Sequence, residues 1–164
     1  MGLKYKKSKI YTSKNEKTRL CDITIYPSKL KALYDKIHAS AYPGINSDNL
    51  PFFVPIARRA TGSTLIHDWM WESRAIYFTE INSLGAQVTL ADQHRVFVVG
   101  PTELRGNQVV CPPALRPAMI VLVAMLGAKG KSILRNVYSI NRGYENIAQR
   151  LNTIGADIKL LNDL

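Results

Sequence analysis

Two arginines stand where the sequence predicts that helices begin. Arg116 immediately precedes Pro117, which favours the first turn of a helix, and Arg142 precedes Gly143 just after Asn141, a candidate N-cap. The start of a helix carries unpaired N–H groups and partial positive charge, so an arginine there strengthens a site already suited to anions. We therefore predict that Arg116 and Arg142 bind carboxylate or phosphate groups. The alternative is that both side chains turn away and pair with surface acids.

Residue types typical of metal centres are too scattered to form one. The two cysteines, Cys21 and Cys111, have no metal-ligand spacing, and His38, His67 and His94 are isolated along the chain. An unpaired cysteine is most often a small buried apolar residue. We predict structural roles for all five residues, and neither a metal nor an organic cofactor.

An internal repeat determines which elements position the arginines. When the chain is laid over itself at an offset of 68, the same residue types recur in the same order. The matching positions are Pro51 near Pro117, Gly62 and Gly130, residues 64–66 and 132–134, Arg74 and Arg142, and, after a two-residue insertion, residues 84–90 and 154–160.

Each copy predicts the order helix, strand, helix, strand. An apolar helix that begins at a proline comes first, and it should end at Gly62 in the first copy and at Gly130 in the second. A β-rich run follows each glycine. A second helix begins at Ser73 or Asn141 as N-cap and stops before Gly85 or Gly155. Alternating apolar residues from 88 and from 158 then start a strand, and in the first copy residues 94–99 return as the second arm of a hairpin.

The N-terminal residues are interpreted as the tail of a preceding copy. Gly2 stands where Gly85 stands, and residues 3–7 and 10–12 should form a similar basic hairpin. The chain thus divides into residues 1–36, a first repeat at 37–110 and a second at 111–164, together one partial domain. We expect a chain that begins in the middle of a repeat to be a fragment of a longer protein.

The formal net charge of +10 is concentrated at the N-terminus. Residues 1–36 hold ten basic and three acidic side chains, a net +7. A basic RNA-binding module is therefore an alternative, but a solvated hairpin is favoured because Tyr5 and Tyr11 form no recognisable stacking motif. The longest apolar run, residues 117–128, is too short to cross a bilayer, and the N-terminus lacks the pattern of a signal peptide. We expect a cytoplasmic protein without a membrane segment.

Four ordered motifs are similar to consecutive motifs of one enzyme family. They are residues 41–48 (AYPGINSD), the run from Gly62 through residues 71–74 (WESR), residues 114–116 (ALR) and residues 141–145 (NRGYE). On these the chain resembles the C-terminal part of the UDP-N-acetylglucosamine 1-carboxyvinyltransferases, within the enolpyruvyl transferase family. The resemblance implies an α/β (α+β) fold of repeated βαβαββ units in an inside-out α/β barrel, here incomplete, with the active site between two domains.

The resemblance also assigns roles. Asp48 resembles the family's aspartate beside the attacking sugar hydroxyl, although its position also suits the N-cap of the helix led by Pro51. Arg116 and Arg142 resemble the arginines that hold phosphoenolpyruvate, and Arg74 resembles a further active-site arginine. Two more residues, Met70 and Trp71, stand where the family lines its sugar-nucleotide side.

Departures from the family pattern limit what this chain is expected to do. Ala114 stands where the family has an aspartate, and the family's Lys-Asn pair and loop cysteine have no counterpart here. The leading hypothesis is a part of an enolpyruvyl transferase that, with the missing remainder, moves enolpyruvate from phosphoenolpyruvate to UDP-N-acetylglucosamine for peptidoglycan precursor synthesis. It should be inactive alone. The alternative is a non-catalytic paralogue that binds a sugar nucleotide or a protein partner.

Overall fold

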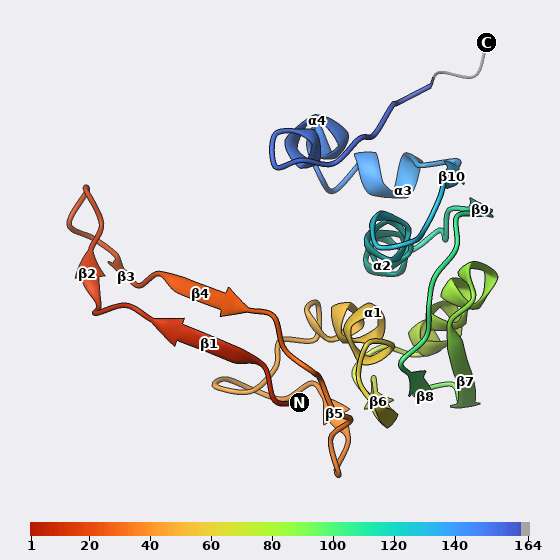
Figure 1. Ribbon diagram of the computed structural model, residues 1–164, viewed down its shortest axis with the longest axis horizontal. Helices are drawn as coiled ribbons and strands as arrows, with labels where there is room; N and C mark the ends of the chain where they lie inside the picture. The colour runs from red at the N-terminus through yellow and green to blue at the C-terminus, as the bar shows by residue number, and fades with distance from the viewer. Residues whose placement is uncertain (162–164) are drawn as a thin grey trace.

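The N-terminal residues form a long antiparallel arm that stands away from the body of the protein. In the computed structural model, which describes residues 1–161, β1 (Lys4–Lys7) pairs with β4 (Ile23–Tyr26), and β2 (Tyr11–Thr12) pairs with β3 (Arg19–Leu20) (Figure 1). A hairpin is therefore present, but the expected pairing of residues 3–7 with residues 10–12 is wrong. The two segments follow one another on one side of the arm, because the chain reverses only at residues 13–18, where Ser13 N–H donates to Thr18 O.

The first half of the body is built on a four-stranded sheet. Its elements are β5 (Ile37–His38), η1 (Leu50–Phe52), α1 (Phe53–Ala57), β6 (Gly62–His67), η2 (Arg74–Leu84), β7 (Gln87–Asp92) and β8 (Arg95–Gly100). The strand order is β5-β6-β8-β7, with β5 parallel to β6 and the other pairs antiparallel. The predicted helix, strand, helix and hairpin occur in order, although η2 is a 3₁₀-helix and α1 ends at Ala57, before Gly62.

The second half repeats this plan only in part. It contains β9 (Gln108–Val110), α2 (Leu115–Leu126), β10 (Ile133–Arg135), α3 (Tyr138–Asn141) and α4 (Ile147–Asn152), with β9 parallel to β10. The prediction that one helix starts at Asn141 is wrong, since α3 ends there. Within the described residues no strand forms at residues 158–160, so the expectation of a strand there is wrong.

Two asparagines show how closely the halves nevertheless correspond. The Asn82 side chain accepts a hydrogen bond from Val88 N–H and donates one to Val88 O, both at 2.8 Å. Asn152 makes the same two bonds with Ile158, both at 2.9 Å. Each asparagine lies at the end of a helix, before the glycine of the matched pair, and both glycines have a positive φ, 98° and 101°, which favours glycine.

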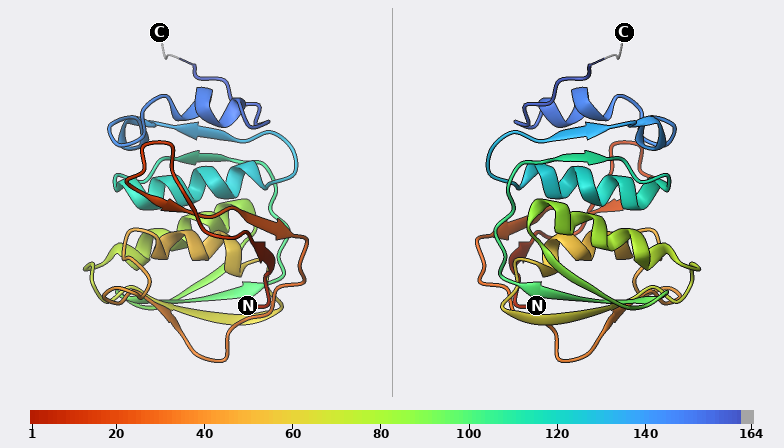
Figure 2. Two further views of the ribbon diagram at one scale, coloured as in Figure 1. Left: turned by 90° about the vertical axis from the view of Figure 1, so that its left-hand side faces the viewer. Right: turned by 90° about the vertical axis from the view of Figure 1, so that its right-hand side faces the viewer.

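Helices lie inside and strands outside in this arrangement. Helices α1, η2 and α2 pack together above the four-stranded sheet, and β9 and β10 lie on the outer side of α2 (Figures 1 and 2). The main core joins the helices to this sheet; fully buried members include Phe78 and Ile81 of η2, Val98 of β8 and Ile120 of α2. Within residues 1–161, every helix is too short or too polar to span a bilayer.

Candidate functional site

An ion pair between Asp48 and Arg116 forms the centre of the candidate site. Arg116 Nη2 donates to Asp48 Oδ2 at 3.0 Å, although the two residues are 68 positions apart in the chain. Arg116 is the second residue of α2. Asp48 precedes η1, whose N-cap is Asn49, so the expectation that Asp48 caps this helix is wrong. The Asp48 carboxylate is instead 45% exposed and directed at arginine.

The start of α2 differs slightly from the prediction. The helix begins at Leu115 and ends at Leu126, so Pro117 is its third residue and Gly127, rather than Gly130, follows its end. Proline is tolerated at this position because the first-turn N–H groups have no partner within the helix. Ala114 is the N-cap and makes no side-chain capping bond.

Tyr144 holds the Arg116 side chain from the other side. Arg116 Nη1 donates to the Tyr144 hydroxyl at 2.6 Å, and the guanidinium carbon lies 5.6 Å from the centre of the tyrosine ring. The hydrogen bond to Asp48 raises the pKa of Arg116, and burial acts in the opposite direction. The guanidinium is therefore cationic and fixed in one orientation.

A second arginine approaches Asp48 from η2. Arg74, the first residue of η2, places Nη1 3.9 Å from Asp48 Oδ1. Its other donors are directed inward: Nε and Nη2 donate to the two oxygens of Asp68 at 2.5 and 2.9 Å, and Nη2 also donates to Ser47 O at 2.8 Å. Asp48 consequently lies between two arginines, one at the start of η2 and one at the start of α2.

The aromatic side chain of Trp71 borders this cluster. The Arg74 guanidinium carbon lies 5.3 Å from the centre of the Trp71 ring. Trp71 and Met70 are each half exposed, and Trp69 Nε1–H donates to Ala39 O at 2.8 Å. The structure thus brings Asp48, Arg74 and Arg116 together, with Trp71 in contact with Arg74.

The remaining arginine, Arg142, occupies a different kind of position. It is exposed and lies at the C-cap of α3, so its predicted place at the start of a helix is wrong. Contacts with the start of α2 hold this segment: Ser139 Oγ–H donates to Pro113 O, and Gly143 lies so close to Leu115 that an added Cβ would meet its side chain at 2.5 Å. Among residues 1–161, no hydrogen bond or ion pair of the Arg142 side chain is found.

Sequence reasoning missed two members of this cluster, Asp68 and Tyr144. Asp68 directly follows β6, and an acid at the end of a strand was the available signal for it. Tyr144 lies in the NRGYE motif beside Arg142, but nothing in its spacing predicted contact with Arg116.

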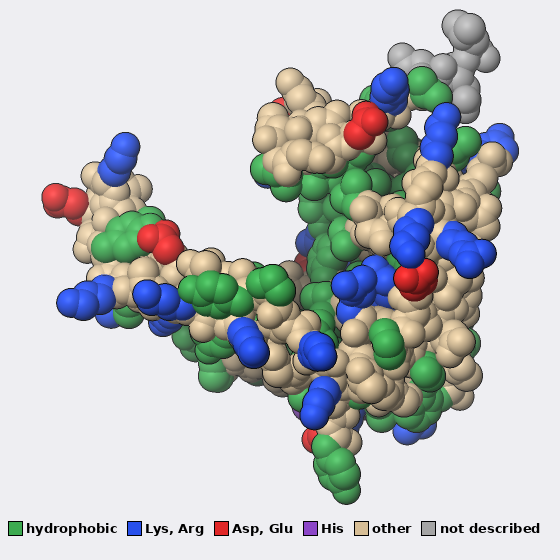
Figure 3. Space-filling model, in the orientation of Figure 1, with side chains coloured by type: hydrophobic (Ala, Val, Ile, Leu, Met, Phe, Trp, Pro, Cys, Tyr) green, Lys and Arg blue, Asp and Glu red, His purple; other side chains and the backbone are tan. Residues whose placement is uncertain are grey.

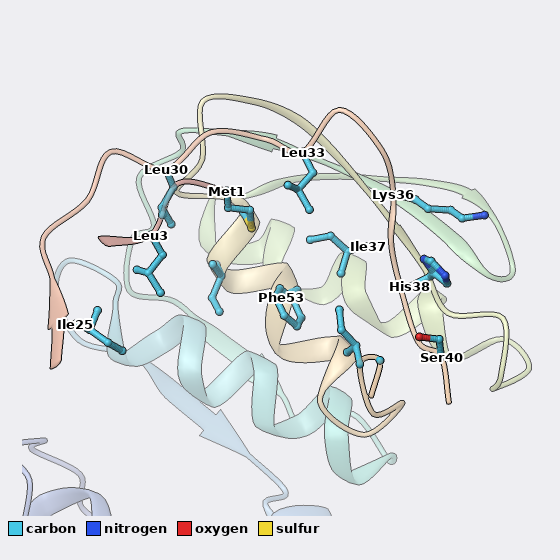
Figure 4. A pocket seen from close by; sticks show the side chains of 13 residues that line it. Met1, Leu3, Ile25, Leu30, Leu33, Lys36, Ile37, His38, Ser40 and Phe53 are labelled. Carbon is cyan, nitrogen blue, oxygen red and sulfur yellow. The ribbon is translucent and has the colours of Figure 1, made fainter. Parts of the chain in front are cut away.

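Two other features lie apart from the charged cluster. A pocket of about 750 Å³ opens between the N-terminal segment and α1 and is lined mainly by apolar side chains, among them Leu3, Ile25 and Phe53 (Figure 4).

Cys111 is buried, and burial raises the pKa of its thiol. In the part of the chain that the structure describes, no cluster of three His, Cys, Asp or Glu residues could hold a metal ion.

Most of this chain matches one known protein family. The family described as EPSP synthase (3-phosphoshikimate 1-carboxyvinyltransferase) matches residues 9–163. The chain belongs to this enolpyruvyl transferase family. The UDP-N-acetylglucosamine 1-carboxyvinyltransferase of Treponema denticola is 39% identical over 131 residues, 80% of this chain and 30% of the relative. That of Treponema pallidum is 34% identical over 165 residues, 96% of this chain and 38% of the relative.

Solved enolpyruvyl transferases share the fold. The enolpyruvyl transferase NikO from Streptomyces tendae matches 92% of this chain and 34% of its own, with a TM-score of 0.70 and 27% identity. EPSP synthase from Acinetobacter baumannii matches with a TM-score of 0.71 at 16% identity, over 98% of this chain and 37% of its own. The chain therefore has a mixed α/β structure that corresponds to about a third of the enolpyruvyl transferase fold.

Proposed function

We propose that this chain supplies one side of the active site of an enolpyruvyl transferase that acts on phosphoenolpyruvate and UDP-N-acetylglucosamine. The observation that carries the proposal is the Asp48 carboxylate held between Arg74 and Arg116 at two helix starts. A carboxylate beside cations can accept a proton from a sugar hydroxyl, while arginines bind the carboxylate and phosphate of the other substrate. The names of the curated relatives support the substrates.

The charge balance of the cluster suits such a reaction. Asp48 and Asp68 together balance Arg74 and Arg116 in the resting state. When the hydroxyl oxygen bonds to C2 of phosphoenolpyruvate, its proton passes to Asp48, and an acid outside this cluster adds a proton to C3, so that a tetrahedral adduct forms. Loss of a proton from C3 then restores the double bond as the bond from C2 to the phosphate oxygen breaks and phosphate leaves. A protonated Asp48 no longer neutralises Arg116, so the guanidinium becomes available to the departing phosphate. Arg142 is proposed as a further ligand of phosphoenolpyruvate, and Met70 and Trp71 as contacts of the sugar nucleotide.

The remainder of the enolpyruvyl transferase fold is proposed as the partner that completes the site. In the first repeat, the face of the hairpin formed by Val88 and Val98 is buried beneath η2. The corresponding face of the arm carries Tyr5 opposite Ile25, which are 63% and 64% exposed. Figure 3 shows hydrophobic side chains in the hollow between this arm and the body, where a further part of the fold would cover them.

The test separates binding from turnover. The chain is titrated with phosphoenolpyruvate while the arginine side-chain NMR signals are followed, and phosphate release is assayed with UDP-N-acetylglucosamine present. We expect shifts at Arg74, Arg116 and Arg142 without phosphate release, because the chain supplies only part of the site. A response unchanged by Arg116→Met would refute the proposed anion site, and steady turnover would refute the need for the remainder of the fold.

The non-catalytic alternative has one specific observation in its favour. Ala114 is the N-cap of α2, directly before Leu115 and Arg116, so the family's second carboxylate is missing at the side of this arginine. Such a paralogue would bind phosphoenolpyruvate or the sugar nucleotide without turnover. Joining this chain to the remaining part of an active relative distinguishes the two functions, since restored phosphate release would support the enzyme.

A further inference from the structure

Asp68 is a buried acid that takes no part in the proposed proton transfer or phosphate release. Its side chain is 0% exposed, and it directly follows β6. Its backbone N–H donates to His94 O at 2.7 Å, and its own carbonyl oxygen lies 3.1 Å from His94 Nδ1. The turn between β7 and β8 therefore fixes the Asp68 backbone, and its carboxylate has a defined position from which to act on a neighbour.

The neighbour is Arg74, and its hydrogen bonds can be counted. A guanidinium has five N–H donors. Asp68 accepts the Nε–H and one Nη2–H, and Ser47 O accepts the other Nη2–H. The Nη1 group lies 3.9 Å from the Asp48 carboxylate, beyond hydrogen-bond distance. Asp68 thus orients the Arg74 guanidinium so that its two remaining N–H donors, both on Nη1, lie on the side of Asp48.

We infer that Asp68 is a positioning residue that holds the guanidinium of Arg74 with its Nη1 donors directed at the anionic substrate. The inference rests on the proposed function of the same site. Without Asp68, only the Nη2 bond to Ser47 O would hold Arg74 back from a two-bond pair with Asp48, which lies close enough to be reached. That pair would occupy both the carboxylate expected to accept a proton and the donors expected to bind the substrate.

The backbone conformation beside Arg74 supports the inference that neighbouring contacts hold this side chain in place. Ser73 has φ 57° and ψ 7°, the left-handed region that is uncommon for serine. Such conformations persist where surrounding contacts determine them, often at functional sites. The Asp68 to Arg74 pair closes this turn, and the same turn delivers Trp71 to the face of the Arg74 guanidinium.

The test uses the full chain and phosphoenolpyruvate as the probe, with arginine side-chain ¹⁵N NMR. Asp68→Asn keeps the size of the side chain but replaces one accepting oxygen with an NH₂ donor. Glu103→Gln is the matched control, because it removes the acid of an exposed pair with Lys129, which lies beyond the opposite end of α2 from Arg116. Arg74→Lys is the second variant, since it keeps a cation beside Asp68 and removes the fork.

We expect separate Nη1 and Nη2 signals for Arg74 in the wild type and averaged signals in Asp68→Asn. A purely structural role of Asp68 would not require this change in a variant that still folds. The affinity for phosphoenolpyruvate should fall at least about tenfold, corresponding to the loss of one charge-assisted hydrogen bond. Glu103→Gln should change it less than about twofold, as expected for an exposed pair. In the Asp68→Asn background, Arg74→Lys should cost almost nothing further.

Each other outcome has a fixed meaning. A folded Asp68→Asn with unchanged Arg74 signals or unchanged affinity overturns the inference. If Asp68→Asn does not fold, Arg74→Lys decides: a tenfold loss supports the fork, and unchanged affinity overturns it. If the wild type does not respond to phosphoenolpyruvate, the proposed function fails. The positioning of Arg74 by Asp68 is then decided by comparing the Arg74 guanidinium signals of the wild type and Asp68→Asn.

Discussion

Replacement of Asn82 by alanine tests whether the repeated asparagine is essential in the first half. The side chain satisfies both backbone groups of Val88, a residue that is only 5% exposed. Each hydrogen bond contributes about 1 kcal/mol, and a backbone group left unpaired in a buried setting costs about 1–3 kcal/mol. Alanine recovers about 0.5 kcal/mol of helix propensity. We therefore expect Asn82→Ala to lower the free energy of unfolding by about 2–3 kcal/mol.

Asn152→Ala provides the control within the same chain. Its two bonds to Ile158 have the same geometry but are exposed, so water can replace them. The expected cost is about 0.5–1 kcal/mol or less. Urea unfolding followed by circular dichroism measures both variants, with the slope of the transition compared to the wild type. Equal losses, or a larger loss for Asn152→Ala, would refute the argument that burial of Val88 determines the difference.

Two further predictions concern the start of α2 and the exposed pair of Asp92 with Arg95. Ala114→Asp should stabilise the protein by about 1 kcal/mol in thermal unfolding, because the N-cap has extended backbone geometry (φ −97°, ψ 137°) and no side-chain cap. Ala114→Asn, which caps the helix without adding charge, should give a similar gain. A loss of stability in both variants would contradict the capping argument. The Asp92 carboxyl should titrate by NMR with a pKa of about 2, below its ordinary 3.8, because Arg95 and then the His94 N–H donate to it. Its contribution to stability is therefore present above about pH 4 and lost as the pH falls through about 2, and Arg95→Met should return the pKa toward 3.8.

The elements that depend on local signals were predictable from the sequence. Gly85 and Gly155 end their segments with positive φ, as glycines after a helix commonly do. The family membership was also predictable, because four motifs occur in order. The pairing within the N-terminal arm was not, since alternation is similar along residues 3–12 and only the turn at residues 13–18 decides which strands face each other.

The misplacement of Arg142 has a similar cause. Asn141 and Ser73 both satisfy the residue preferences of an N-cap, but only Ser73 precedes a helix in the structure. In the second half the chain packs Gly143 against Leu115 and starts α4 only at Ile147. Tertiary packing thus overrides a local preference worth about 1 kcal/mol.

The centre of the candidate site could not have been predicted from the repeat. Asp48 lies two residues before η1 begins at Leu50, whereas Arg116 is the second residue of α2, so a separation of 68 does not make them equivalent in the structure. Their ion pair at 3.0 Å forms because folding brings together the segments that precede and begin two different helices. Arg74 and Arg142, which the repeat does match, differ for the same reason. Among the described residues, Arg74 pairs with the buried Asp68, whereas Arg142 is exposed at the end of α3 and has no such acid.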